Sequence, residues 1–281
     1  MYLSYHDSGN STLIHVQRSD NDGVAWHRVG DPIVGQDGIT AGSTFNNIQG
    51  PIVADSVTHN VYDIFASGQT GFLKGRTFTP NHVFVSRSTD AGKHWTASLV
   101  FQLPPPAKFD NVFPALAVDS TNGNLYAAFS EGYHVFFSMS SDQGVHWSPA
   151  VVVNVAPATT AIFPWIAAHA GTVDVVYYAT PAASKNDASA IWNVYLTQTT
   201  DSGASFAQSA VSNTSNHTSV ICTNGTGCAP GTRNLLDLFK VAINPADGRA
   251  AVIYTDDTLT KIQPAIRCRR SCWQHSSSVL R

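Results

Sequence analysis

An eight-residue pattern, Ser/Thr-x-Asp/Asn-x-Gly-x-x-aromatic, occurs four times in this chain and constrains its fold more than any other feature. The copies begin at residues 19, 88, 140 and 199, so successive copies start 69, 52 and 59 residues apart. This spacing suits a repeated unit of four strands joined by loops of variable length. The residues at the fixed positions are Ser19, Asn21, Gly23, Trp26, Ser88, Asp90, Gly92, Trp95, Ser140, Asp142, Gly144, Trp147, Thr199, Asp201, Gly203 and Phe206.

Each residue type in the pattern has a mechanical role. The hydroxyl and the carboxylate or amide oxygen can accept hydrogen bonds from nearby main-chain N–H groups, and glycine adopts the positive φ that other residues resist. The aromatic side chain can then pack beneath the turn as an apolar plug. The pattern therefore predicts four tight turns that are structural rather than catalytic.

A second repeat lies between the copies and predicts the remaining strands. Each copy follows an alternating strand, over 13–17, 83–87, 135–139 and 194–198. Pairs of apolar strands, the first often led by proline, fall at 51–55 and 60–65, 114–119 and 124–129, 164–168 and 173–178, and 239–244 and 250–254. Interleaved, the two repeats predict a unit with strands A, B and C, the eight-residue turn, and strand D.

This arrangement resembles the bacterial neuraminidase-repeat, or Asp-box, propellers of the sialidase superfamily, over about residues 1–257. The resemblance implies an all-β propeller of four-stranded antiparallel blades, of which the family has six or seven. The expected domain covers 1–260, as a partial blade at 1–34, blades at about 47–103, 110–155 and 161–211, and a partial blade at 236–257. About four to five blades are thus expected, and 261–281 differs in composition and is expected to be an atypical tail.

The strand order places the candidate catalytic residues. In a meander the B–C and D–A loops lie opposite the Asp boxes, and the resemblance implies that a ligand binds there. Glu131, the only glutamate, follows a B strand and precedes Tyr133 by two residues. Because sialidases use a tyrosine nucleophile, a carboxylate beside it and an aspartic acid/base, we predict these roles for Tyr133, Glu131 and Asp110. The alternative is that Glu131 is a solvated loop residue and Asp110 a turn former.

The resemblance also implies that arginines bind the carboxylate of sialic acid, since the guanidinium can pair with it through two hydrogen bonds. Arg76 and Arg233 fall on the expected ligand face, and Asp237 is a further candidate for substrate binding or acid/base chemistry. The Phe/Tyr-Arg-Ile-Pro motif of the family is absent. The function expected is a sialidase-like glycoside hydrolase with an incomplete site, acting on sialylated or related glycans; the alternative is a non-catalytic module that binds glycan or protein.

Composition excludes several other functions. Charged residues make up 12% of the chain, and the net charge is −3. The sequence contains no polybasic run of the kind that would indicate nucleic acid as a partner. No apolar stretch approaches the roughly 20 residues of a membrane span, and no spacing suggests a metal site or a cofactor. Cys222 and Cys228 are expected to form a disulfide. That pair and the scarcity of Lys and Glu favour a secreted or periplasmic protein, with its signal peptide truncated.

Overall fold

The computed structural model describes residues 1–6, 13–33, 47–68, 80–110, 112–235, 239–258 and 274–275. Within these ranges the regular elements are β-strands, apart from one short 3-10 helix, η1 (Gly225–Gly227). In this part of the chain no helix has the length and apolar character needed to cross a membrane. The prediction of an all-β chain is confirmed.

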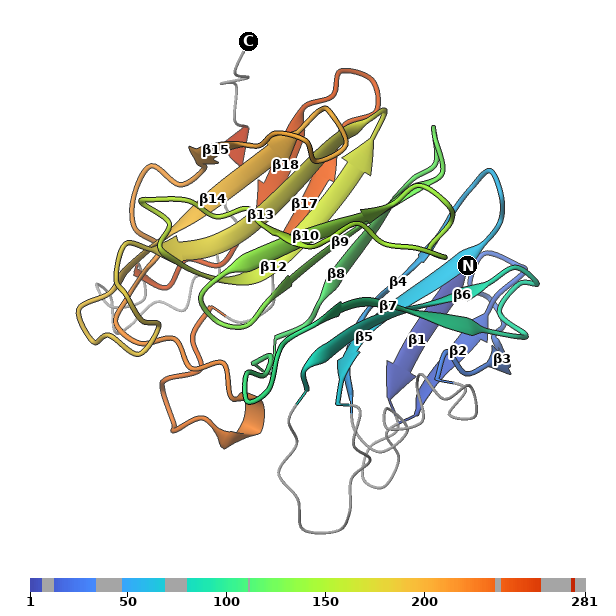
Figure 1. Cartoon of the computed structure of the whole chain (residues 1–281), viewed down its shortest axis with the longest axis horizontal. Helices are drawn as coiled ribbons and strands as arrows, with labels where there is room; N and C mark the ends of the chain where they lie inside the picture. The colour runs from blue at the N-terminus through green and yellow to red at the C-terminus, as the bar shows by residue number, and fades with distance from the viewer. Residues whose placement is uncertain are drawn as a thin grey trace. The chain divides into compact units, whose positions relative to one another are not determined.

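The strands form five sheets (Figure 1). The first contains β1 (Tyr2–His6), β2 (Ile14–Arg18) and β3 (His27–Gly30). The second contains β4 (Asn47–Ala54), β5 (Val61–Ser67), β6 (His82–Ser88) and β7 (Thr96–Gln102). The third contains β8 (Ala115–Asp119), β9 (Asn124–Ser130), β10 (Val135–Ser140) and β11 (Val151–Val152). The fourth contains β12 (Thr160–His169), β13 (Thr172–Thr180), β14 (Ile191–Thr199), β15 (Ala207–Ala210) and β16 (His217–Thr218). The fifth contains β17 (Lys240–Ile243), β18 (Ala250–Ile253) and β19 (Gln274–His275).

The order of strands in each sheet follows the order in the chain, as in a meander. The four Asp boxes lie between β2 and β3, β6 and β7, β10 and β11, and β14 and β15, so all four occupy C–D hairpins as predicted. Two short strands add to this plan. In the fourth sheet β16 pairs with β14, and β19, from the segment expected to be a tail, pairs with β18.

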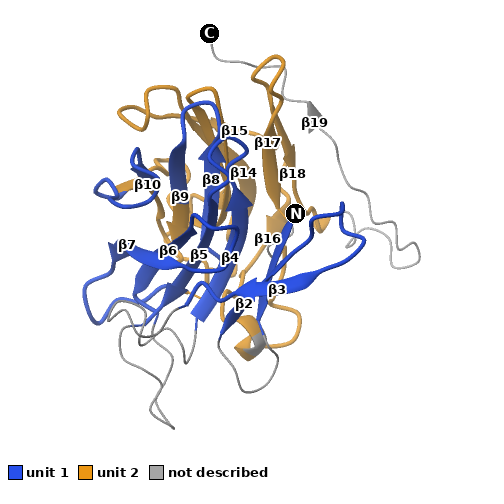
Figure 2. Cartoon of the chain, turned by 90° about the vertical axis from the view of Figure 1, so that its right-hand side faces the viewer, with its two compact units in different colours: residues 1–109, 113–127, 138–150 blue, residues 110–112, 128–137, 151–281 orange. Residues whose placement is uncertain are grey.

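The chain divides into two compact units (Figure 2). Each unit has its own apolar core. Unit 1 comprises residues 1–109, 113–127 and 138–150, and unit 2 comprises 110–112, 128–137 and 151–281. In unit 1, Ile14, Phe65 and Phe84 belong to one buried cluster and Val16, Val61 and Trp95 to another. In unit 2 a larger cluster includes Val112, Trp192, Ile221 and Phe239.

The Asp boxes share one set of turn contacts. In the second box the Ser88 hydroxyl donates to Asp90 Oδ1 at 2.9 Å and accepts the Gly92 N–H at 2.8 Å. Asp90 Oδ1 also accepts the His94 N–H at 2.9 Å. The glycine has φ +89°, as predicted, and the residue before it, Ala91, has φ +64°. The other boxes repeat this pair of left-handed residues at 22–23, 143–144 and 202–203.

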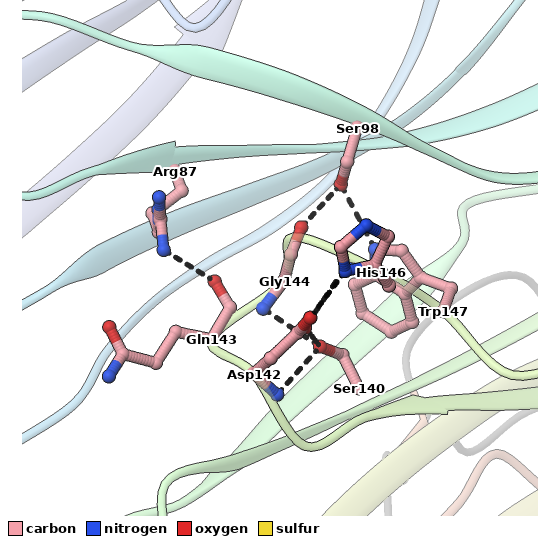
Figure 3. A network of polar contacts seen from close by, with 8 residues as sticks. All are labelled: Arg87, Ser98, Ser140, Asp142, Gln143, Gly144, His146 and Trp147. Atoms are coloured by element: carbon pink, nitrogen blue, oxygen red, sulfur yellow. Dashed lines mark hydrogen bonds and ion pairs between the residues drawn. The ribbon is translucent and has the colours of Figure 1, made fainter.

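The third box is tied to the sheet that precedes it in the chain (Figure 3). Ser98 of β7 donates to the Gly144 carbonyl at 2.6 Å and accepts the Trp147 indole N–H at 3.0 Å. Arg87 of β6 donates to the Gln143 carbonyl at 3.3 Å. These groups all lie in unit 1. The box is therefore both a hairpin turn and a connector between successive sheets.

The box carboxylates are held in their ionised form. The His94 main-chain N–H, and then its ring, keep the pKa of Asp90 well below its ordinary value, and His146 does the same for Asp142. In the fourth box the hydroxyl and N–H of Ser205 lower the pKa of Asp201 to about 2. Hydrogen bonds to the charged form explain all three shifts. The boxes keep their turn contacts to low pH.

Asp63 is a buried carboxyl group in β5 with a different environment. Its side chain is fully buried, and among the described residues neither carboxyl oxygen has a hydrogen-bond partner. Burial raises the pKa of Asp63 well above 3.8. Burial therefore favours the neutral, protonated form of Asp63 inside unit 1.

We predict that Ser140→Ala destabilises the protein by about 1–3 kcal/mol, because it leaves the buried Gly144 N–H without its acceptor. The matched control is Ser141→Ala, at the exposed neighbouring position, which should change the free energy of unfolding by less than about 0.5 kcal/mol. Urea denaturation of both variants measures the difference. Equal effects would contradict the structural role of the box hydroxyl.

We predict that Asp63→Asn becomes more stable relative to the wild type as pH rises. The folded pKa lies above the unfolded value of 3.8, so wild-type stability is lost as pH rises from the unfolded towards the folded pKa, whereas asparagine does not titrate. Urea denaturation between about pH 4 and pH 8 tests this.

Asp55→Asn is the control, because the pKa of Asp55 is shifted in the opposite direction from that of Asp63. Its carboxylate accepts hydrogen bonds from Val57 and Thr58, and the pKa of Asp55 is lowered from 3.8. The stability that this carboxylate contributes is complete above pH 3.8. The loss of unfolding free energy in Asp55→Asn, relative to the wild type, should therefore stay constant between about pH 4 and pH 8. A constant difference for Asp63→Asn as well would show that Asp63 is not a buried neutral acid.

Candidate functional site

The candidate catalytic residues lie on the turn between β9 and β10 and on the segment before β8, all within unit 2. The Ser130 hydroxyl accepts the Gly132 N–H and donates to the Ala161 carbonyl, both at 3.0 Å. The Tyr133 carbonyl accepts the Ala161 N–H at 2.8 Å and the Asn154 amide at 3.3 Å. The turn backbone is thus fixed by β12 and by the segment after β11.

Asp110 is the centre of a polar cluster that links three loops. Its Oδ2 atom accepts hydrogen bonds from the Lys185 ammonium and, at 2.7 Å, from the Thr223 hydroxyl. The Lys185 and Asp110 side chains are 12% and 20% exposed, so the ion pair is largely shielded from water. Lys185 lies between β13 and β14, and its carbonyl accepts the Ile221 N–H at 3.1 Å.

Tyr133 lies beside this ion pair. The Lys185 ammonium is 5.5 Å from the centroid of the Tyr133 ring, which is the range of a cation–π interaction. Tyr133 is 40% exposed, so part of the ring faces solvent. Among the described residues its hydroxyl has no hydrogen-bond partner. Lys185 therefore contacts both Asp110 and Tyr133.

Glu131 contacts His134, and no hydrogen bond joins it to Tyr133. Its Oε2 atom accepts the His134 main-chain N–H at 3.0 Å, and its Oε1 atom pairs with His134 Nδ1. The glutamate is 16% exposed and the histidine 50% exposed. The carboxylate expected beside the tyrosine is therefore directed to the neighbouring imidazole.

Arg233 follows a loop that contains both a disulfide and Thr223, the hydroxyl donor to Asp110. Cys222 and Cys228 form the expected bridge, with their Cα atoms 5.9 Å apart. The Cys222 N–H donates to the Thr232 carbonyl at 2.9 Å, and the next residue after Cys222 is Thr223, the donor to Asp110. Arg233 is exposed and forms no ion pair within the described ranges. Arg76 and Asp237 lie outside the described residues.

Lys185, Thr223 and His134 are the site residues that the sequence did not indicate. Lys185 and Thr223 reach Asp110 across 75 and 113 residues of chain, and neither belongs to a motif. His134 lies three residues after Glu131, a spacing that could have suggested the pair. In the described part of the chain no group of three or more His, Cys, Asp or Glu side chains could hold a metal ion.

Comparison with known proteins identifies the fold. Neither a family model nor a curated protein matches the sequence. An α-L-arabinanase from Penicillium chrysogenum, complexed with arabinobiose, aligns with 91% of this chain and 71% of its own, at 14% identity and a TM-score of 0.53. A Hadza microbial sialidase aligns with 89% of this chain and 51% of its own, at 15% identity and a TM-score of 0.52.

A leech intramolecular trans-sialidase complexed with 2,7-anhydro-Neu5Ac gives a similar result. It aligns with 87% of this chain and 33% of its own, at 12% identity and a TM-score of 0.52. The chain thus spans about half of the sialidase and a third of the trans-sialidase. At these identities the likeness defines the fold, which is that of the sialidase-type β-propellers. Its structural neighbours are glycoside hydrolases.

We predict that Gly132→Ala disrupts the Asp110–Lys185 pair. Gly132 has φ +100°, and a Cβ atom there would meet Asp110 Oδ2 and lie 2.7 Å from Lys185 Nζ. The matched control is Gly123→Ala, where φ is +77° and no atom of the described residues lies within 4 Å of the added Cβ. The control should lose about 1 kcal/mol through backbone strain alone, and Gly132→Ala about 1–3 kcal/mol more. Urea denaturation of the two variants measures this, and equal losses would contradict the close approach.

Proposed function

We propose that this chain is part of a sialidase-like glycoside hydrolase that acts on sialylated or related glycans at the cluster of Asp110, Glu131 and Tyr133. The observation that carries the proposal is that the exposed Tyr133 lies beside the Asp110–Lys185 ion pair, on the turn that also carries the shielded Glu131. The fold is that of glycoside hydrolases, which supports this class of reaction without identifying the sugar.

Tyr133 is the proposed nucleophile. Its hydroxyl is free of hydrogen bonds among the described residues, and its ring is fixed by the turn backbone and by Lys185. A tyrosine at the end of a blade can bond to the anomeric carbon of a sugar whose own carboxylate would repel a carboxylate nucleophile. Arg233 is the proposed partner for that substrate carboxylate, because its guanidinium is exposed and can donate two parallel hydrogen bonds.

A non-catalytic glycan-binding module is the second candidate, and one observation favours it. Both site carboxylates already have partners, Lys185 and Thr223 for Asp110 and His134 for Glu131. What faces solvent is an aromatic ring beside a cation, an arrangement that can hold a sugar without chemistry. Binding without turnover would identify this function.

The proposed location is outside the cytoplasm. The Cys222–Cys228 disulfide joins two residues of an irregular loop, and such bridges persist in oxidising compartments. The proposed partner is therefore an extracellular glycan. No cofactor is required for the proposed chemistry.

We predict that the protein releases 4-methylumbelliferone from a fluorogenic α-sialoside faster than from the corresponding α-L-arabinofuranoside. Tyr133→Phe should lower kcat on the sialoside by about 10³-fold or more, because the nucleophilic oxygen is lost. Arg233→Ala should mainly raise KM. Tyr195→Phe, at a largely buried tyrosine of β14, is the matched control and should leave kcat unchanged.

Calorimetric titration with 3'-sialyllactose and with arabinobiose separates the two candidate functions. Binding of sialyllactose without release of the fluorophore would establish the binding module. Turnover that survives in Tyr133→Phe would reject the nucleophile but keep the hydrolase. If neither glycan binds and neither substrate turns over, both proposals are wrong.

A further inference from the structure

Asp110 is held through one of its two carboxylate oxygens. Its Oδ2 atom accepts hydrogen bonds from the Lys185 ammonium and, at 2.7 Å, from the Thr223 hydroxyl. Gly132 packs against the same oxygen so closely that a Cβ atom there would overlap it. The other oxygen, Oδ1, has no hydrogen-bond partner among the described residues, and it is not fully buried, so solvent reaches it. Because a carboxylate oxygen accepts hydrogen bonds, Oδ1 is available to a ligand.

Thr223 is fixed by the two residues before it as well as by its own contact. Ile221 is fully buried in the apolar cluster of unit 2, and its N–H donates to the Lys185 carbonyl at 3.1 Å. Cys222 belongs to the disulfide that closes the same loop. Thr223 itself is 4% exposed. Since its backbone is held in this way, the Thr223 hydroxyl selects the Asp110 oxygen that points inward and leaves the other one at the surface.

The Tyr133 ring lies beside the same ion pair. It is 40% exposed, and the Lys185 ammonium is 5.5 Å from its centroid. Because one ammonium contacts both the ring and Asp110, the two are close enough for one disaccharide to span. An aromatic ring can pack against the C–H face of a sugar, while a few polar groups fix the orientation of the ligand. Asp110 Oδ1 is such a polar group.

We infer that Asp110 Oδ1 binds a hydroxyl or amide group of the glycan and that Thr223 is the residue that positions it. The inference rests on the proposed function only in placing the glycan at this cluster, and it holds equally for hydrolysis and for binding without turnover. It gives Asp110 a role in specificity instead of the acid/base role expected from the sequence, because a carboxylate paired with Lys185 has no proton to give to a departing oxygen.

The test uses the whole chain. Calorimetry gives Kd for 3'-sialyllactose and for arabinobiose, and the 4-methylumbelliferyl α-sialoside gives KM and kcat. Thr223→Val keeps the shape of the side chain but removes the donor to Asp110, so it should raise Kd and KM by about 3–10-fold. Asp110→Asn should raise both by about 10–100-fold, because hydrogen bonds to a charged group are stronger. In both variants kcat should change by less than about threefold, since the interaction lost is one of binding.

Two further variants separate positioning from a loss of structure. Thr223→Ser retains the hydroxyl and should keep Kd and KM within about twofold of the wild type. Thr197→Val is the matched control, because it removes a fully buried hydroxyl of β14, in the same unit, that lies 3.3 Å from the Val153 carbonyl. It should lower the free energy of unfolding, as Thr223→Val does, but leave Kd and KM unchanged. Urea denaturation of all four variants measures the stability.

The outcomes distinguish this inference from the proposed function. A wild type that binds a glycan, together with a folded Thr223→Val variant whose Kd and KM are unchanged, would overturn the inference alone. Equal losses in Thr223→Ser and Thr223→Val would also overturn it, and so would a fall in kcat with unchanged KM in Asp110→Asn. Binding without turnover, with the expected rise in Kd, would overturn the hydrolase and support the inference. A wild type that binds neither glycan would overturn both.

Discussion

The pair of left-handed residues in each Asp box is the constraint on which the rest of the structure depends. Two consecutive positive φ values, as at Ser202 and Gly203, reverse the chain within a tight hairpin. The Thr199 hydroxyl and the Asp201 carboxylate bond the main-chain N–H groups of that turn. The reversal fixes the register of β14 against β15. It also fixes which end of the sheet carries the B–C loop with Lys185.

The sequence predicted the glycine of each box but not the left-handed residue before it. Asp22, Ala91, Gln143 and Ser202 occupy that position and share no side-chain property. Their conformation comes from the hydrogen bonds on both sides of the turn, which are a property of the whole motif. The hairpins and their strands could be predicted because their apolar patterns repeat. The two-residue strands β16 and β19 could not, since so short a pairing leaves no pattern.

The candidate site was predictable where the strand order alone determines position. The ends of the B strands and the starts of the A strands lie on one side of a meander, so Tyr133 and Asp110 were expected to converge. The partners that determine their chemistry could not be found in this way. Lys185 and Thr223 approach Asp110 from loops 75 and 113 residues away, and the apolar cluster containing Trp192 and Ile221 fixes those loops. The local sequence does not indicate such contacts, because they join segments that lie far apart in the chain.

The proposed preference for a sialoside over an arabinoside depends on the charges of the candidate site. Asp110 is paired with Lys185, and Glu131 with His134, so each carboxylate of the cluster has a partner that can carry positive charge. Arg233 is exposed without an ion pair within the described ranges. A neutral arabinoside would leave that guanidinium with water alone, whereas the carboxylate of a sialoside would pair with it through two hydrogen bonds. The proposed preference for a sialoside rests on this exposed guanidinium.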